Sequence, residues 1–177
     1  MCAASSPQLE TERLLLRRFQ DADLPSVVEM NSDPDVMRFI GNGQVATEQQ
    51  SHAMIAKQEA QWDEKGFAFF AVQERSSGET VGLCGINIPY FYPEILPAVE
   101  IGWRFRRPFW GQGYATEAAH AALDFGLNVL EVSTIYGFAN PDNVPSLRVM
   151  DKIGMSFQRT IHISKYDLSA QLYAVHK

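Results

Sequence analysis

The sequence predicts an α+β domain with helices on both faces of a central sheet, and three observations support this class. Residues Val99 to Phe105 alternate between two faces as a strand does, and a turn containing glycines then leads into apolar residues at helical spacing from Tyr114 onward. Residues Phe67 to Val72 are apolar on both faces, which is typical of a central strand covered on both sides. The segment RSSGET at 75–80 has the composition of a hairpin turn, and it joins that strand to another at Val81 to Ile88.

Length and composition predict one domain. The 177 residues are 46% apolar and 20% charged, as in ordinary globular proteins, so we expect residues 9–177 to form a single core and residues 1–8 a short flexible lead. The net charge of -6 argues against a broad nucleic-acid surface. The chain lacks both an apolar run of about eighteen residues and a basic start followed by an apolar segment, which predicts a cytoplasmic protein without a membrane partner.

Cysteine and histidine usage predicts neither a disulfide framework nor a metal site. Cys2 lies in the expected lead, and Cys84 lies inside an apolar strand, where a free thiol behaves as a small hydrophobic group. The histidines are scattered without the spacing of metal ligands: His52, His120, His162 and His176.

The remaining elements follow in order along the chain. The first half is expected to form a strand at Arg13 to Phe19, a helix at Leu24 to Asn31, a short helical piece at Val36 to Phe39, and a helix from the N-cap Thr47 through Glu64. Gly66 closes that last helix. The second half is expected to form strands at Ser133 to Ala139, Ser156 to Ile163 and Leu168 to Val175, with a helix at Val144 to Lys152.

The turn before Tyr114 is a candidate phosphate site. Gly111 and Gly113 allow backbone angles that other residues avoid, and unpaired N–H groups at the start of the following helix favour an anion. No lysine follows Gly113, which excludes the P-loop pattern, and Thr116 stands where a dinucleotide fingerprint needs glycine or alanine. On the glycines alone, a tight connection without a ligand remains an equal alternative.

Three segments together resemble the GCN5-related N-acetyltransferase (GNAT) superfamily. They are WGQGYATEA at 110–118, NPDNVPSLRVMDKIGM at 140–155 and LETERLLLRRF at 9–19. The resemblance is narrower to the branch of ribosomal-protein N-terminal acetyltransferases, the RimJ/RimL-like proteins. It implies a mixed, mostly antiparallel sheet of six to seven strands, flanked by helices on both faces. It also implies that the fourth and fifth strands, Val99 to Phe105 and Ser133 to Ala139, splay apart.

The resemblance also implies acetyl-CoA as cosubstrate, without a metal. The pantetheine arm would lie along the strand that ends at Phe105, and the diphosphate would lie on the N–H groups of the glycine-containing turn. The implied cofactor-binding residues are Trp103, Arg104, Phe105, Arg106, Gly111, Gln112, Gly113, Tyr114, Ala115, Thr116, Asn140 and Asn143. Pro108 departs from the family pattern and has no N–H to donate. Either Arg106 or Arg107 replaces that contact, or both are solvated surface charges.

Two residues are candidates for proton transfer. Glu100 lies on the polar face of its strand, where many relatives carry a glutamate that acts through water, and the alternative is a structural carboxylate. The tyrosine that many members use as proton donor is replaced by Met150. Ser146 matches the serine proposed for this role in the ribosomal-protein branch. Asn143 and Ser146 also fit ordinary helix capping, and both interpretations can hold together. By analogy, a main-chain N–H near Trp103 or Arg104 would stabilise the oxyanion.

The expected function is acetyl transfer to a primary amine by direct attack in a ternary complex. A protein N-terminal α-amine is the favoured acceptor, since its pKa of about 8 leaves it partly neutral at physiological pH. The alternatives are a small-molecule amine acceptor and a nonenzymatic acyl-CoA-binding or sensor domain. A homodimer is possible. Specificity would reside in the loops Ile40 to Ala46, Tyr90 to Pro97 and Ser164 to Ala170. The loop at 90–97 reads equally as a pocket wall or as a packed surface loop.

Overall fold

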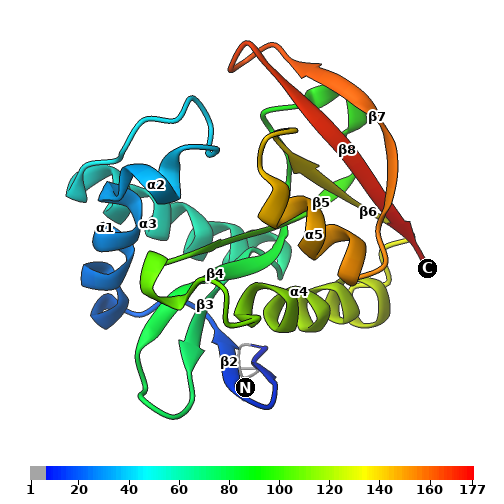
Figure 1. Ribbon diagram of the computed structural model, residues 1–177. Coiled ribbons are helices and arrows are strands. Elements are labelled where there is room, and N and C mark those ends of the chain that lie inside the picture. The colour runs from blue at the N-terminus through cyan, green and yellow to red at the C-terminus, as the bar shows by residue number, and fades with distance from the viewer. Residues whose placement is uncertain (1–6) are drawn as a thin grey trace.

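The computed structural model describes residues 7–177, and an eight-stranded sheet forms its centre (Figure 1). Along the sheet the strands follow the order β1-β2-β3-β4-β5-β6-β8-β7. Their bounds are β1 Leu9–Glu10, β2 Leu14–Arg17, β3 Phe69–Glu74, β4 Thr80–Asn87, β5 Val99–Phe105, β6 Thr134–Ala139, β7 Ser156–Ile163 and β8 Leu168–His176. The sequence predicted seven of these strands. The eighth is the short β1, which pairs with Leu15 and Leu16 of β2. Cys2 and most of the predicted lead lie outside the described residues.

The helices lie in the predicted order; α5 has the predicted bounds, and the other helices differ from the prediction at one end or both by one or a few residues. They are α1 Leu24–Ser32, α2 Pro34–Met37, α3 Glu48–Lys65, α4 Tyr114–Asp124 and α5 Val144–Lys152, with short 3₁₀ turns η1 Asp21–Asp23, η2 Pro93–Ile95 and η3 Arg107–Phe109. A π-helical turn, η4 Phe125–Val129, continues α4. The Thr47 side chain accepts from Gln50 N–H in the predicted capping box of α3, and Gly66 ends that helix in the left-handed conformation.

The predicted splay lies between β5 and β6. These two strands are parallel and pair at only two positions, Val99 with Ile135 and Glu100 with Tyr136. On its other edge β5 stays paired with β4 as far as Phe105. The backbone of β5 beyond Glu100 therefore faces an open gap on the β6 side. The other neighbouring strands pair antiparallel, as the mostly antiparallel prediction required.

Helices cover both faces of the sheet. The larger core lies beneath α4, where Ala118 and Ala122 pack with Phe70, Ile86 and Ile101. A smaller cluster on the opposite face joins α1 to the sheet through buried aliphatic side chains: Val27, Met30, Ala71 and Leu83. In Figure 1 the β7–β8 hairpin projects on the side away from α1, α2 and α3. Because β5 lies between these layers, one of its faces packs toward α4 and the other faces the side of the sheet that α1 covers.

Candidate active site

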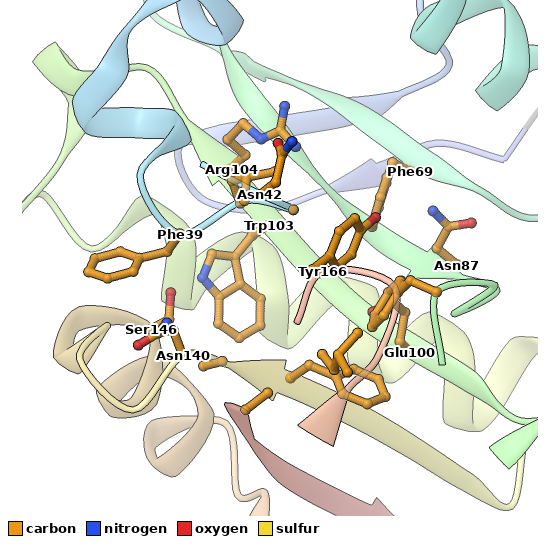
Figure 2. A pocket seen from close by; sticks show the side chains of 18 of the residues that line it. Phe39, Asn42, Phe69, Asn87, Glu100, Trp103, Arg104, Asn140, Ser146 and Tyr166 are labelled. Carbon is orange, nitrogen blue, oxygen red and sulfur yellow. The ribbon is translucent and has the colours of Figure 1, made fainter. Parts of the chain in front are cut away.

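A cavity of about 820 Å³ opens where β5 and β6 part (Figure 2). Its walls come from the loop between α2 and α3, from α3, from the β5 strand, from the start of α5 and from the turn between β7 and β8. The structure brings six of the predicted site residues to this cavity: Glu100, Trp103, Arg104, Asn140, Asn143 and Ser146. Phe91 also lines it while Tyr92 is buried behind, so the 90–97 loop is a wall with packed residues beneath.

Glu100 is a buried carboxyl group in this cavity. Its side chain is 9% exposed and accepts no hydrogen bond from any residue between 7 and 177. Burial raises the pKa of Glu100 to about 8, because the charged form loses its hydration without gaining a partner. A carboxyl group with a pKa this close to neutrality can accept a proton from an amine and release it again.

Gly102 and Arg104 share the face of β5 on which Glu100 lies. A Cβ atom at Gly102 would come within 3.0 Å of the Phe69 ring, so the glycine allows that ring to pack against the strand. Arg104 donates from Nη1 to the Oδ1 atom of Asn31, a buried residue of α1. Burial also lowers the pKa of Arg104 to about 10, and the guanidinium is still charged at neutral pH.

Trp103 and Phe105 lie on the other face of β5, toward α4. Phe105 is buried in the core, so only its main chain can meet a ligand, and its carbonyl already accepts from Trp110 Nε1 at 2.8 Å. Trp103 is partly exposed and lines the cavity at the splay. Figure 2 shows the indole near the centre of the view, with Phe39 and Ser146 to its left.

The glycine-containing turn forms a cradle of main-chain N–H groups, which we define as residues Gly111 to Thr116. Gly111 and Gly113 have φ of 74° and 83°, angles that favour glycine. Gly113 is the N-cap of α4, and no side chain caps the first N–H groups of the helix. A Cβ atom at Gly111 would meet nothing within 4 Å, so the space before the helix is open. This geometry suits a diphosphate such as that of acetyl-CoA.

Two side chains in the cradle are committed elsewhere. Gln112 donates from Nε2 to the Pro108 carbonyl at 3.0 Å. Tyr114 is buried, and its hydroxyl donates to Glu74. Gln112, Tyr114 and Ala115 would therefore contact a phosphate only through their main-chain N–H groups. Thr116 is partly exposed, so its hydroxyl would be an additional donor.

The cradle is held from below by the first strands, a connection that sequence reasoning missed. Arg13 donates from Nη1 to the Gln112 carbonyl at 2.9 Å and forms an ion pair with Glu117 at 2.7 Å. The Thr11 hydroxyl donates to the same carboxylate at 2.6 Å. Although burial opposes it, these hydrogen bonds hold the pKa of Glu117 below its ordinary value. The only signal in the sequence was the TER motif itself, whose partners lie about a hundred residues away.

The structure does not bring the Arg106 side chain to the cradle. Its guanidinium forms ion pairs with Glu29 and Glu79 and donates to the Thr80 carbonyl, on the α1 side of the sheet. The prediction of Arg106 as a phosphate ligand is therefore corrected, because two carboxylates distant in sequence occupy its donors. Arg107 forms an exposed ion pair with Asp35 at 2.6 Å.

Asn143 and Ser146 form the predicted cap of α5. The Asn143 Oδ1 atom accepts from the Ser146 main-chain N–H at 3.3 Å. The Ser146 hydroxyl is not used in this cap and is free to face the cavity, as Figure 2 shows together with Asn140. Asn140 accepts from the Asp142 N–H at 2.9 Å and thereby shapes the turn before the helix.

Within residues 7–177, no group of three or more histidine, cysteine, aspartate or glutamate side chains could hold a metal ion. Cys84 is fully buried, and burial raises the pKa of its thiol. None of the described helices is both long enough and apolar enough to cross a membrane.

Comparison with known proteins identifies the family. The profile described as an acetyltransferase (GNAT) domain matches residues 13–156, so the chain belongs to the GNAT acetyltransferase family and is an acetyl-CoA-dependent N-acetyltransferase. It is 37% identical over 147 residues to YnaD of Bacillus subtilis, an uncharacterized N-acetyltransferase. The alignment covers 83% of this chain and 81% of YnaD.

Solved structures agree with this assignment. A GNAT-family acetyltransferase from Bacillus anthracis is 32% identical, with a TM-score of 0.80 over 96% of this chain and 98% of that one. RimL, a ribosomal-protein alpha-N-acetyltransferase solved in complex with coenzyme A, has a TM-score of 0.78 over 96% of this chain and 98% of that one. The identity to RimL is 14%, so this likeness shows the fold.

Proposed function

We propose that this chain acetylates a primary amine by direct attack within a ternary complex. One observation carries the proposal: β5 separates an open cradle of N–H groups from a cavity that holds Glu100, and the unpaired edge of β5 connects the two. This edge offers N–H and carbonyl groups with which the amides of a pantetheine arm can pair. When bound, acetyl-CoA supplies an activated thioester.

In this proposal Glu100 accepts the proton of the attacking amine through a water molecule. A bond forms between the amine nitrogen and the acetyl carbon, and the bond from that carbon to sulfur breaks. A main-chain N–H at Trp103 or Arg104 stabilises the negative charge on the carbonyl oxygen. The Ser146 hydroxyl donates a proton to the departing thiolate, and Asn143 holds the start of α5 in position.

Two acceptor classes have support. The fold shared with RimL, together with the TER and NPDN segments, favours a protein N-terminal α-amine. A compact amine is favoured by the contact between two loops that line the cavity: a Cβ atom at Gly41 would lie 3.7 Å from the Tyr166 ring. The Tyr166 side chain of the β7–β8 turn therefore comes close to the loop after α2 at the cavity, which leaves less room for a folded protein.

Release of free thiol from acetyl-CoA tests this function. Purified protein is mixed with acetyl-CoA and a panel of small amines and peptides with free N-termini, and acetyl-CoA affinity is measured separately by calorimetry. Thiol release that depends on an acceptor supports the proposal. Tight acetyl-CoA binding without release for any acceptor would instead support the nonenzymatic acyl-CoA sensor.

A further inference from the structure

Arg104 is a half-buried arginine without a carboxylate partner among residues 7–177. Two other arginines with little exposure are each neutralised: Arg17 lies 2.7 Å from Asp23, and Arg106 forms ion pairs with Glu29 and Glu79. Arg104 has a single neutral acceptor, the Asn31 side-chain oxygen. Its Nε atom is buried without a hydrogen bond, as is that of Arg106, so the absence of a carboxylate is what distinguishes Arg104. A buried charge is costly unless it is paired. An anion bound in the cavity would supply the missing partner.

The surroundings of Arg104 favour an anion. The charged side chains that line the cavity are Arg38, Lys57, Arg104, Lys165 and Glu100. None of the four cations forms an ion pair with a described residue, although the chain as a whole has a net charge of -6. Glu100 is mostly protonated at neutral pH and so does not neutralise them. The cavity is therefore a positive site in an acidic protein, which attracts anionic ligands.

The anion that Arg104 would bind is not the diphosphate of acetyl-CoA. Arg104 lies on the face of β5 toward Asn31 of α1, whereas the cradle begins α4 on the other face. No cradle residue lines the cavity. Figure 2 shows the Arg104 guanidinium beside Asn42, away from Ser146 and Asn140. An anion at Arg104 would thus belong to the acceptor.

We infer that the acceptor is a small primary amine that carries a carboxylate, and that Arg104 binds this carboxylate while the amine lies near Glu100. This inference rests on the proposed function and names its substrate class. Glu100 and Arg104 are four residues apart on one strand, or about 13 Å between Cα atoms. At this separation, several bonds would lie between the amine and the carboxylate of the acceptor. A guanidinium matches a carboxylate with two parallel hydrogen bonds.

The test uses ω-amino carboxylates of increasing chain length, each paired with its primary amide. We expect kcat/KM to be at least about tenfold higher for a carboxylate than for its amide, with the largest ratio at an intermediate chain length. In Arg104→Gln this ratio should fall to near one. The matched control is Arg159→Gln, which removes an exposed charge of β7 outside the cavity and should keep the ratio. Arg104→Lys retains the charge and should retain part of the preference.

Separate readouts distinguish the possible failures. Coenzyme A affinity and the melting temperature confirm that each variant is folded. Equal kcat/KM for carboxylates, amides and peptides with amidated C-termini would overturn the inference and leave the transferase function standing. If no amine gives turnover, the proposed function fails. Calorimetric titration of the amino carboxylates into the coenzyme A complex then tests whether Arg104 binds the carboxylate. Binding that is lost in Arg104→Gln supports the inference, whereas binding equal to that of the amides overturns it.

Discussion

Glu100 combines two properties that rarely occur together, because it is buried and yet has no hydrogen-bond partner in the described part of the chain. Its pKa of about 8 means that the carboxyl group ionises as the pH rises from neutral to mildly alkaline. As a general base it acts only when ionised, so activity should rise through this range.

The first prediction is that kcat/KM of the wild type increases with pH, reaches half of its limiting value near pH 8 and levels off at higher pH. Glu100→Gln should lower kcat at least about a hundredfold and remove this rise, because the amide cannot accept a proton. The measurement is the pH profile of both kcat/KM and kcat, with an acceptor whose amine is neutral over the whole range. An unchanged rise in the variant would assign the ionisation to another group.

The second prediction separates the two roles at the start of α5. Ser146→Ala keeps the main-chain N–H that Asn143 caps, so it should lower kcat by about tenfold or more without changing the melting temperature. Asn143→Ala loses the cap and should cost about 1 kcal/mol of stability. Turnover and thermal unfolding of both variants provide the measurement. Normal turnover in Ser146→Ala would remove that hydroxyl from the mechanism.

Sequence reasoning succeeded for residues whose role depends on near neighbours. Alternation along Val99 to Phe105 placed Glu100 and Arg104 on one face, and spacing identified the Asn143 cap. It failed for Arg106, whose carboxylate partners Glu29 and Glu79 lie on other elements. Nothing in the sequence indicates that the Arg104 side chain reaches Asn31, and the predicted cofactor contact of its main-chain N–H stays a prediction.

At the scale of elements, the cradle depends on the connection between β5 and α4. The third prediction is that Gly111→Glu abolishes acetyl-CoA binding, since it places a carboxylate where the diphosphate would lie. Gly111→Gln is the matched control: it has the same length and the same strain at φ of 74°, but no charge. Calorimetry should give at least about a tenfold weaker affinity for the glutamate variant than for the glutamine variant. Equal affinities would contradict a phosphate site at this turn.

The fourth prediction concerns the support of the cradle by the first strands. Arg13→Gln removes the hydrogen bond to the Gln112 carbonyl and the ion pair to Glu117, so acetyl-CoA affinity should fall severalfold. The global fold should persist because Arg13 is 43% exposed. Arg159→Gln removes an exposed guanidinium of β7 that is distant from the cradle and from residues 11–13, and it should leave the affinity unchanged. Equal affinities in Arg13→Gln and the wild type would refute this support.

Among the helices, α5 has the predicted bounds, and local signals also predicted α3 well. Its capping box at Thr47 and its closing glycine at Gly66 are both confirmed, with the helix ending within one residue of the prediction. The short β1 was missed because two residues carry no periodicity, and only its pairing with β2 defines it as a strand. The end of α4 was also missed, since its change to a π-helical turn at Phe125 leaves the apolar spacing nearly unaltered.

At the scale of the whole molecule, the two halves of the sheet are joined by a short seam, the two residue pairs between β5 and β6. Glu100 belongs to this seam through its pairing with Tyr136. Ionisation of Glu100 would therefore place an unpaired charge at the two residue pairs that join β5 to β6.

The fifth prediction follows from the sign of that pKa shift. Between about pH 4.5 and pH 8 the unfolded chain has lost the Glu100 proton while the folded chain retains it, so the folded state binds more protons. The free energy of unfolding should consequently fall as the pH rises, by at most about 1.4 kcal/mol per pH unit from this group. Urea unfolding of the wild type and Glu100→Gln at several pH values measures it. The variant should gain stability relative to the wild type as the pH rises, and a constant difference would contradict the prediction.

The global arrangement was predictable only through the family resemblance. Composition and periodicity indicated α+β elements, but the strand order and the splay depend on contacts between distant segments. The cavity is likewise built by loops from opposite ends of the chain, as Gly41 and Tyr166 illustrate. No local pattern could place these two residues together.

The cavity and the cradle are built by different segments of the chain, and this separation affects how the protein can evolve. The loop after α2 and the β7–β8 turn enclose the cavity, whereas the cradle and the core beneath α4 lie elsewhere in the fold. Substitutions in these two loops leave the packing under α4 untouched. A duplicated gene could therefore drift toward a new metabolite while inheriting an intact donor machinery, and Arg104 is the inherited residue that would keep such descendants biased toward acids.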